Sequence, residues 1–210
     1  MYISKLNSHV LLIHSCRTEA ATKFDFCPAT YVLPGDYALF VEEFKRHSGS
    51  GAVWIMKPIG KAQGKGIFLF HRLSQISQWK SEHRWKPDNP SVESYVAQRY
   101  ISNPQLVGGK KFDLRLYVLT TSFSPLQAWM YRSGFARFSA SRYSNAPSDI
   151  MNTFVHLTNV AVQKGSSSYN AETGGKWDLR KLKLHLISKH GKAKVDQLFV
   201  EMQDICIQSL

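Results

Sequence analysis

The sequence predicts a mixed α/β fold of the α+β type, with mostly antiparallel sheets flanked by helices. Three features indicate it: short apolar runs between glycine-bearing turns, an alternating segment over residues 111–121, and apolar residues at helical spacing after residues 36 and 178. The 210-residue chain is 43% hydrophobic and 20% charged, which is typical of globular proteins. We therefore expect a folded protein with a substantial core.

The first predicted elements are a helix and a hairpin. Asp36 is predicted to cap a helix that begins at the next residue. Its apolar positions follow helical spacing: Tyr37, Phe40, Val41 and Phe44. Residues 52–56 and 67–70 are predicted to be strands joined by a flexible loop over residues 60–66. The hairpin would therefore carry a basic, glycine-bearing tip.

A short helix, an exposed loop and two further extended segments are predicted next. Leu73, Ile76 and Trp79 indicate the helix, residues 81–90 the loop, and residues 95–101 a strand. In the segment over residues 111–121, one predicted face is apolar: Phe112, Leu114, Leu116 and Val118. Asp113 and Arg115 would lie on the other face.

The later strands and helices complete the predicted order. Residues 127–132 and 135–138 are predicted to pair as a hairpin about Ser133 and Gly134, and residues 154–162 to be extended. Asp178 would cap a helix that Gly191 ends. A last helix carries an apolar stripe: Val195, Leu198, Phe199, Met202, Ile205 and Cys206. No stop signal follows the stripe before Leu210, so we expect that the intact protein continues or that a partner covers this face.

The charge and the cysteines limit the classes of partner and compartment. Lys and Arg number 27 against 15 Asp and Glu, and the resulting charge of +12 favours an acidic partner. Nucleic acid, anionic membrane, nucleotide phosphates and acidic protein tails all satisfy that requirement. Cys16, Cys27 and Cys206 lack disulfide or metal spacing, which favours the reducing cytoplasm. No apolar run has the length of a signal peptide or membrane span, so we expect a soluble protein with no membrane partner.

Residues 57–66 contain the strongest candidate for chemistry. Three lysines and three glycines alternate there between two predicted strands. Glycines let backbone N–H groups approach an anion, and lysines add mobile positive charge, so this composition suits a polyphosphate. The spacing matches neither the Walker pattern nor the dinucleotide fingerprint. From composition alone, a phosphate loop and an exposed basic hairpin are equally supported.

Other polar groups allow structural explanations too. Asp113 and Arg115 could form an ordinary ion pair on a solvated strand face. Arginines and aromatic residues alternate over residues 129–143, a pattern that could stack single-stranded RNA but more often packs within a sheet. The eight histidines show no metal-ligand spacing, and no serine or cysteine lies in a nucleophile motif.

Five short motifs, taken in order, resemble those of the tubulin tyrosine ligase-like family. They are Trp54-Ile55-Met56-Lys57-Pro58, Gln63-Gly64-Lys65-Gly66-Ile67, Gln98-Arg99-Tyr100-Ile101, Lys111-Phe112-Asp113-Leu114-Arg115 and His156-Leu157-Thr158-Asn159-Val160. The resemblance covers residues 24–210. It implies an ATP-grasp fold and ATP-dependent ligation of glutamate to glutamate side chains of tubulin tails.

The resemblance also assigns roles to residues. It implies that ATP is bound by Lys57, Lys65, Gly66, Gln98, Arg99, Tyr100, Ile101, Lys111, Phe112, Asp113, Thr158 and Asn159. The lysines and Gly66 would hold phosphates, and residues 98–101 would form the hinge that recognises adenine. Arg115 and Arg137 are implied to be catalytic, and Arg137 and Lys176 to bind free L-glutamate.

The implied organisation has two parts. Residues 24–101 would be a central subdomain, residues 102–210 part of a C-terminal subdomain, and residues 1–23 have no assigned role. The family's Mg²⁺ ligands would lie beyond Leu210, so no metal ligand is expected in this chain, which alone would be catalytically incomplete.

The expected partners are acidic tails of tubulin on microtubules. The expected location is the cytoplasm and cytoskeleton, at a cilium or flagellum axoneme or a basal body. A non-catalytic, basic microtubule-binding protein is the alternative, and an RNA-binding module is less favoured because it leaves the motif order unexplained; we expect no nucleic-acid partner.

Overall fold

The fold is built from two four-stranded sheets and a separate two-stranded ribbon. The computed structural model describes residues 26–77, 79, 93–170, 172 and 175–210. Every strand pairing among them is antiparallel. The predicted mixed α/β class with antiparallel sheets is therefore confirmed.

The first sheet has the strand order β1-β4-β2-β3. These strands span Thr30–Leu33, Tyr95–Arg99, Trp54–Pro58 and Phe68–Phe70. Helix α2 (Tyr37–Arg46) covers one face, where Phe40, Trp54 and Phe70 are fully buried. The β2–β3 hairpin and the strand β4 confirm three sequence predictions.

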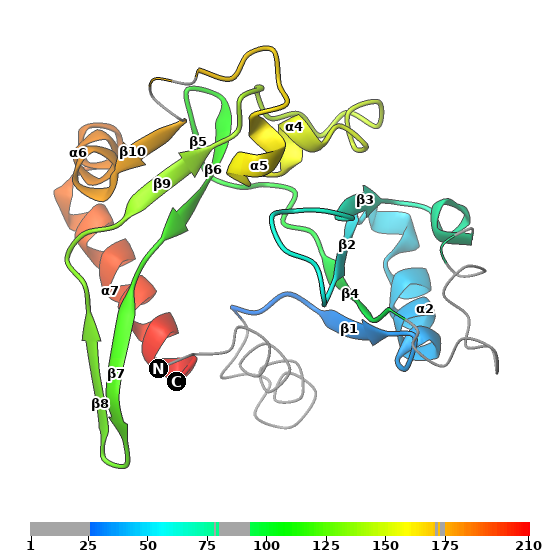
Figure 1. Ribbon diagram of the computed structural model, residues 1–210, viewed down its shortest axis with the longest axis horizontal. Helices are drawn as coiled ribbons and strands as arrows, with labels where there is room; N and C mark the ends of the chain where they lie inside the picture. The colour runs from blue at the N-terminus through cyan, green and yellow to red at the C-terminus, as the bar shows by residue number, and fades with distance from the viewer. Residues whose placement is uncertain (1–25, 78, 80–92, 171, 173–174) are drawn as a thin grey trace.

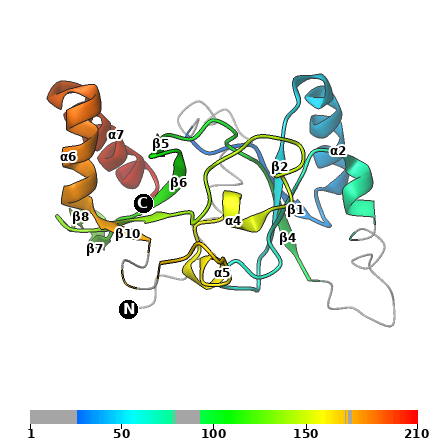
Figure 2. The same cartoon turned by 90° about the horizontal axis from the view of Figure 1, so that it is seen from above.

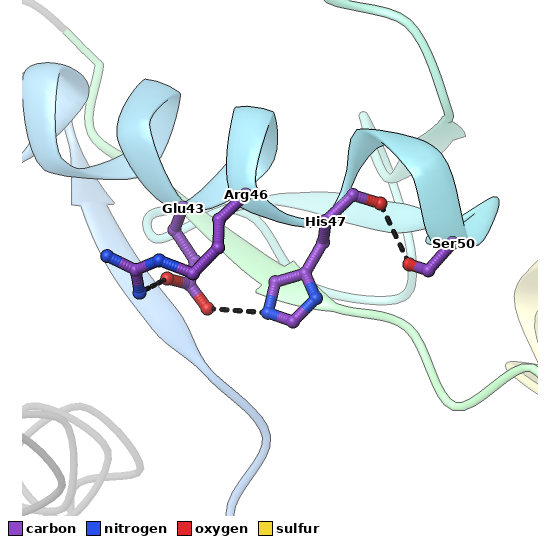
Figure 3. Close-up of polar contacts among 4 residues, drawn as sticks. All are labelled: Glu43, Arg46, His47 and Ser50. Carbon is purple, nitrogen blue, oxygen red and sulfur yellow. Dashed lines mark hydrogen bonds and ion pairs between the residues drawn. The ribbon is translucent and has the colours of Figure 1, made fainter.

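Helix α2 is where helical spacing predicted it, but its first residue is capped differently. Asp36 occupies the N-cap position, yet its carboxylate accepts a hydrogen bond from the Val32 amide at 2.8 Å instead of capping the helix. At the other end, Glu43 binds both Arg46 and His47 (Figure 3). The Ser50 hydroxyl donates to the His47 carbonyl at 2.8 Å and continues the turn (Figure 3). Two short 3-10 helices follow, at Ser48–Ser50 and Leu73–Ile76, and the second lies within the predicted short helix.

The second sheet has the strand order β10-β9-β6-β5. Its strands span Lys176–Asp178, Phe135–Phe138, Lys110–Arg115 and Leu106–Val107. Helices α6 (Leu179–His190) and α7 (Lys192–Gln208) pack against one face around Leu182, Leu186 and Val195. Asp178 and Gly191 lie at the ends of α6 as predicted, with Gly191 at φ 84°, but the Asp178 side chain makes no capping hydrogen bond. Of the predicted stripe on α7, Val195 is buried and Phe199 packs beside it, whereas Leu198 and Ile205 are exposed.

The helices lie on the outer sides of the two sheets. Figure 1 and Figure 2 both show α2 at one end of the molecule and α6 and α7 at the other. The short helices α4 (Thr153–His156) and α5 (Val160–Gln163) lie between the sheets in both views. The sheet faces without long helices are therefore turned towards the middle of the molecule.

The predicted single strand over residues 111–121 is wrong. The chain leaves the second sheet after β6 and forms β7 (Val118–Phe123), which pairs with β8 (Leu126–Met130) in the ribbon at the lower left of Figure 1. The predicted hairpin about Ser133 and Gly134 is also wrong, because β8 pairs with β7 while β9 pairs with β6 and β10. Apolar and polar residues keep alternating where the chain passes from β6 to β7. The alternation therefore cannot show that the chain leaves one sheet and enters another.

The extended segment predicted over residues 154–162 is wrong as well, because α4 and α5 occupy it. Each is a single four-residue turn, too short to show a helical repeat. Asn152 caps α4 by accepting a hydrogen bond from the Phe154 amide at 3.1 Å. The loop predicted over residues 81–90 lies outside the described residues. Within the described part of the chain, no helix combines the length and apolarity needed to cross a membrane.

Candidate functional site

Strand alternation places Lys57 and Gln98 on the inner face of the first sheet. They lie on the neighbouring strands β2 and β4 and share this face with Ile55. The Lys57 ammonium donates to Gln98 Oε1 at 2.6 Å, and the Gln98 amide donates to Thr30 Oγ1 at 2.8 Å. Burial lowers the pKa of Lys57, and the nearby Cys27 partly offsets that effect. The Lys57 ammonium is partly buried and, within the described residues, bonded only to a neutral amide, so an anion would stabilise its charge.

Lys111 reaches the same region from β6 of the second sheet. Its ammonium donates to Tyr100 Oη at 2.8 Å and to the His156 carbonyl at 3.0 Å. Burial and, to a smaller extent, the positive charge of Lys57 lower the pKa of Lys111 to about 8, against an opposing effect of Asp113. The two lysines are therefore close enough to repel each other, and a ligand with several negative charges would relieve that repulsion.

Asp113, Arg137 and Lys176 form a row across three strands of the second sheet. Arg137 lies opposite Asp113 on β6 and opposite Lys176 on β10. Arg137 Nε donates to Asp113 Oδ1 at 2.9 Å, and its Nη2 donates to Asp113 Oδ2. Bonding to Asp113 raises the pKa of Arg137. The Lys176 ammonium lies 5.1 Å from the Phe135 ring centroid on the same face, so two cations face one side of the sheet.

The glycine-bearing loop closes against α5. Gly64 has φ 85°, and a Cβ built there would lie 3.0 Å from Val162 Cγ2 and 3.2 Å from Asn159 Cγ. Only glycine fits both that conformation and that contact. The loop and Asn159, predicted as parts of one ATP site, are thus adjacent, and Thr158 beside them is buried. Lys65 is exposed on the loop.

Two of the implied residues turn their side chains to the opposite sheet face, and a third is exposed. The Phe112 side chain is on the opposite face of β6 and packs with Phe138 beneath α6 and α7. Arg99 is exposed and alternates to the opposite face from Gln98. Ile101 is 60% exposed after the end of β4. Arg115, implied to be catalytic, lies on the same face of β6 as Asp113.

The site contains polar partners that sequence reasoning missed. Thr30 holds the Gln98 amide, and no sequence signal marks it. His156 is 2% exposed and bonds to Tyr100, although the motif His156-Leu157-Thr158-Asn159-Val160 had suggested roles only for its last polar residues. Gln163, also 2% exposed, accepts from the Ala140 amide at 2.7 Å and so ties α5 to the strand end after β9.

The donors of this surface suit phosphates better than a metal ion. Lysine ammonium groups and loop amides bind phosphate oxygens. Within the described residues, no three His, Cys, Asp or Glu side chains gather at metal-binding distance. The Asp113 carboxylate, on this surface, is occupied by Arg137.

Two hollows elsewhere in the molecule include none of the implied site residues. One, of about 540 Å³, lies between the end of β8 and the helices α6 and α7 and carries Arg132, Arg180 and Lys183. The other, of about 500 Å³, is lined in part by His47 and His71. The candidate site is defined by residues of both sheets, and its chemistry comes from the lysines and arginine on them.

Comparison with known proteins identifies the family of this chain. The sequence profile of the Tubulin-tyrosine ligase family matches residues 1–210. The chain belongs to the tubulin-tyrosine ligase family. The fold of this family is ATP-grasp-like, and the antiparallel sheets with flanking helices agree with it.

Curated relatives in this family share up to half of their aligned residues with the chain. A probable tubulin polyglutamylase of Caenorhabditis elegans is 50% identical over 194 residues, covering 91% of this chain and 45% of that protein. A probable tubulin polyglutamylase of Mus musculus is 48% identical, covering 93% and 48%. A probable alpha-tubulin polyglutamylase of Tetrahymena thermophila is 44% identical, covering 89% and 45%. The chain spans about half the length of these relatives.

Proposed function

We propose that the protein containing this chain is an ATP-dependent ligase that adds glutamate to glutamate side chains of tubulin tails. The observation that carries the proposal is the approach of Lys57 and Lys111, from two different sheets, beside a glycine-bearing loop. The names of the related polyglutamylases support the choice of reaction. Because the chain spans about half of those proteins, the activity is proposed for the whole protein.

The proposed ATP site lies between the two sheets. Lys57, Lys65 and Lys111 bind phosphate oxygens, together with the amides of the loop that ends at Gly66. The backbone of residues 98–101 recognises the adenine edge. Ile55, Leu69 and Leu157 pack in one apolar cluster beside Tyr100, which gives the base a nonpolar surface.

The proposed chemistry has two steps. A carboxylate of the tubulin tail attacks the γ-phosphorus of ATP, which forms an acyl phosphate and releases ADP. The amine of free glutamate then attacks the acyl carbon, forms the isopeptide bond and expels phosphate. Lysines and Arg115 neutralise charge on the phosphoryl oxygens. Mg²⁺ would supply further neutralisation in such a reaction.

Arg137 and Lys176 are proposed to bind the carboxylates of free glutamate. Asp113 occupies two donors of the Arg137 guanidinium, and an arginine has five, so donors remain for a substrate. The paired carboxylate fixes the guanidinium plane before the substrate arrives. Two separate cations match the two carboxylates of glutamate and discriminate against amino acids with one.

The wider setting follows from the same reaction. Residues 24–101 and 102–210 are proposed to act as the central and C-terminal subdomains around ATP. The charge of +12 suits an acidic tubulin tail. Microtubules of the cytoskeleton, in a cilium, flagellum or basal body, are the proposed location.

Labelled glutamate, ATP, Mg²⁺ and microtubules, incubated with the whole protein, test the proposal. We expect ATP-dependent incorporation that Lys57→Ala, Lys111→Ala and Arg137→Ala each abolish, whereas Lys189→Ala, an exposed change on α6, leaves it intact. Incorporation of glycine or tyrosine in preference to glutamate would contradict the proposed substrate. Salt-sensitive microtubule binding with no ATP dependence would instead favour the basic, non-catalytic alternative.

A further inference from the structure

A buried polar chain connects Lys111 to the backbone beyond the proposed ATP site. The Lys111 ammonium donates to Tyr100 Oη at 2.8 Å, and Tyr100 Oη lies 3.0 Å from His156 Nδ1. His156 Nε2 lies 3.0 Å from the carbonyl oxygen of Asp149. The chain joins β6, the end of the hinge, and α4, which are separate parts of the fold.

Chemistry constrains the hydrogen bonds in this chain. A carbonyl oxygen only accepts, so His156 Nε2 carries the proton that bonds to Asp149, and Nδ1 has a lone pair for the Tyr100 hydroxyl proton. Tyr143 also bonds to Tyr100, and its own hydroxyl donates to the Ser102 carbonyl at 2.9 Å, so its oxygen is a second acceptor for that proton. An ammonium only donates, so the Tyr100 oxygen accepts from Lys111 with either acceptor.

The surroundings keep His156 neutral, as this arrangement requires. Burial lowers the pKa of His156 and the charge of Lys111 lowers it further, although the Asp149 carbonyl opposes them. The Lys111 ammonium also lies over the Tyr100 ring, 4.4 Å from its centroid. The ammonium is therefore held by a hydroxyl, a carbonyl and an aromatic face.

We propose that Tyr100 and His156 are positioning residues that orient the Lys111 ammonium for the phosphates of ATP. The inference rests on the proposed function, because Lys111 is a phosphate ligand there. Neither side chain needs to contact ATP for this role. In its hydrogen-bond chain, His156 acts through Tyr100, and Tyr100 acts through Lys111.

The variant Tyr100→Phe tests the role with the least disturbance. It keeps the ring that packs among Ile55, Leu69 and Leu157 and removes only the oxygen. The other titratable groups near Lys111 or its hydrogen-bond partners are retained in this variant: Lys57, Asp113, His156 and Tyr143. Tyr131→Phe is the matched control, because Tyr131 is an exposed residue directly after β8.

The first measurement is the NMR titration of the Lys111 side chain in the 210-residue protein without nucleotide. Loss of the hydroxyl acceptor removes support for the charged amine, so the midpoint should fall by about half a pH unit or more in Tyr100→Phe. His156→Leu should cause a similar fall, and His156→Asn, which restores an acceptor for the hydroxyl, should recover part of it. Unchanged midpoints in Tyr100→Phe and His156→Leu would overturn the inference.

The second measurement is ATP affinity as a function of pH. ATP should bind about five-fold more weakly to Tyr100→Phe at pH 8, with a smaller loss at pH 6.5, where Lys111 stays charged. Equal affinities for Tyr100→Phe and the unmodified protein, in a protein whose ATP binding needs Lys111, would overturn the positioning role. If the unmodified protein binds no ATP, the proposed function fails, and the NMR result still judges the hydrogen-bond chain separately.

Discussion

Arg137 on β9 lies directly opposite Asp113 on β6, and the two side chains form a two-point ion pair on the sheet face that has no long helix. The contact ties together two strands that are 24 residues apart in the chain. Because Asp113 satisfies only part of the guanidinium, the pair orients Arg137 and leaves it able to bind another carboxylate. The neighbouring Lys176 adds a second cation across β10.

Replacing Arg137 by alanine should weaken glutamate binding about ten-fold to 100-fold, because a charged hydrogen bond is worth roughly 1.5 to 3 kcal/mol. Titration calorimetry with glutamate in the presence of an ATP analogue measures the effect. Arg132→Ala, an exposed arginine outside β9, is the matched control. Equal affinities for the two variants would exclude Arg137 as a glutamate ligand.

Replacing Gly64 by alanine should reduce the free energy of ATP binding by more than it reduces the free energy of unfolding. The residue has φ 85°, and its new methyl group would press against Val162 and Asn159. The loop would have to move away from α5 and withdraw its amides from the phosphates. Gly49→Ala, where a Cβ meets open space, is the control. Fluorescence titration with an ATP analogue measures affinity, and an unchanged value would show that the loop does not contact nucleotide.

The sequence predicted local elements better than the contacts between them. Helical spacing found α2, the terminal residues Asp178 and Gly191 found α6, and the hairpin of β2 and β3 followed from its apolar runs and glycines. The crossing from β6 to β7 was missed because Leu116 and Val118 continue the same alternation across the change of sheet.

The candidate site shows the same division. The lysines were found because glycine and lysine composition and motif order marked them. Thr30 and Gln163 were missed because each acts through a partner far along the chain, Gln98 and the Ala140 amide. Such pairings arise from tertiary packing and leave no periodic signal in one sequence.

Replacing Leu182 by alanine should lower the free energy of unfolding by about 2 to 5 kcal/mol, because it opens a cavity in the core between α6, α7 and the second sheet. Leu182 is fully buried there, whereas Leu184 on the same helix is 58% exposed. Leu184→Ala is therefore expected to change stability by less than about 1 kcal/mol. Urea unfolding followed by circular dichroism compares the two. Equal losses would mean that α6 does not pack as described.

Acid should destabilise the protein through His156. Burial lowers the pKa of His156 in the folded protein below its usual value of 6.5. The unfolded chain therefore binds a proton at this position in a pH range where the folded protein does not. The stability contributed by the neutral imidazole is present above about pH 6.5 and is lost as the pH falls through the folded-state pKa. His156→Asn carries no titrating group, so its stability should change less between pH 7 and pH 5 than that of the unmodified protein. His190→Asn, at the exposed end of α6, should retain the original pH dependence. Urea midpoints measured at both pH values test this, and parallel curves for all three proteins would show that His156 is not the group whose protonation opposes folding.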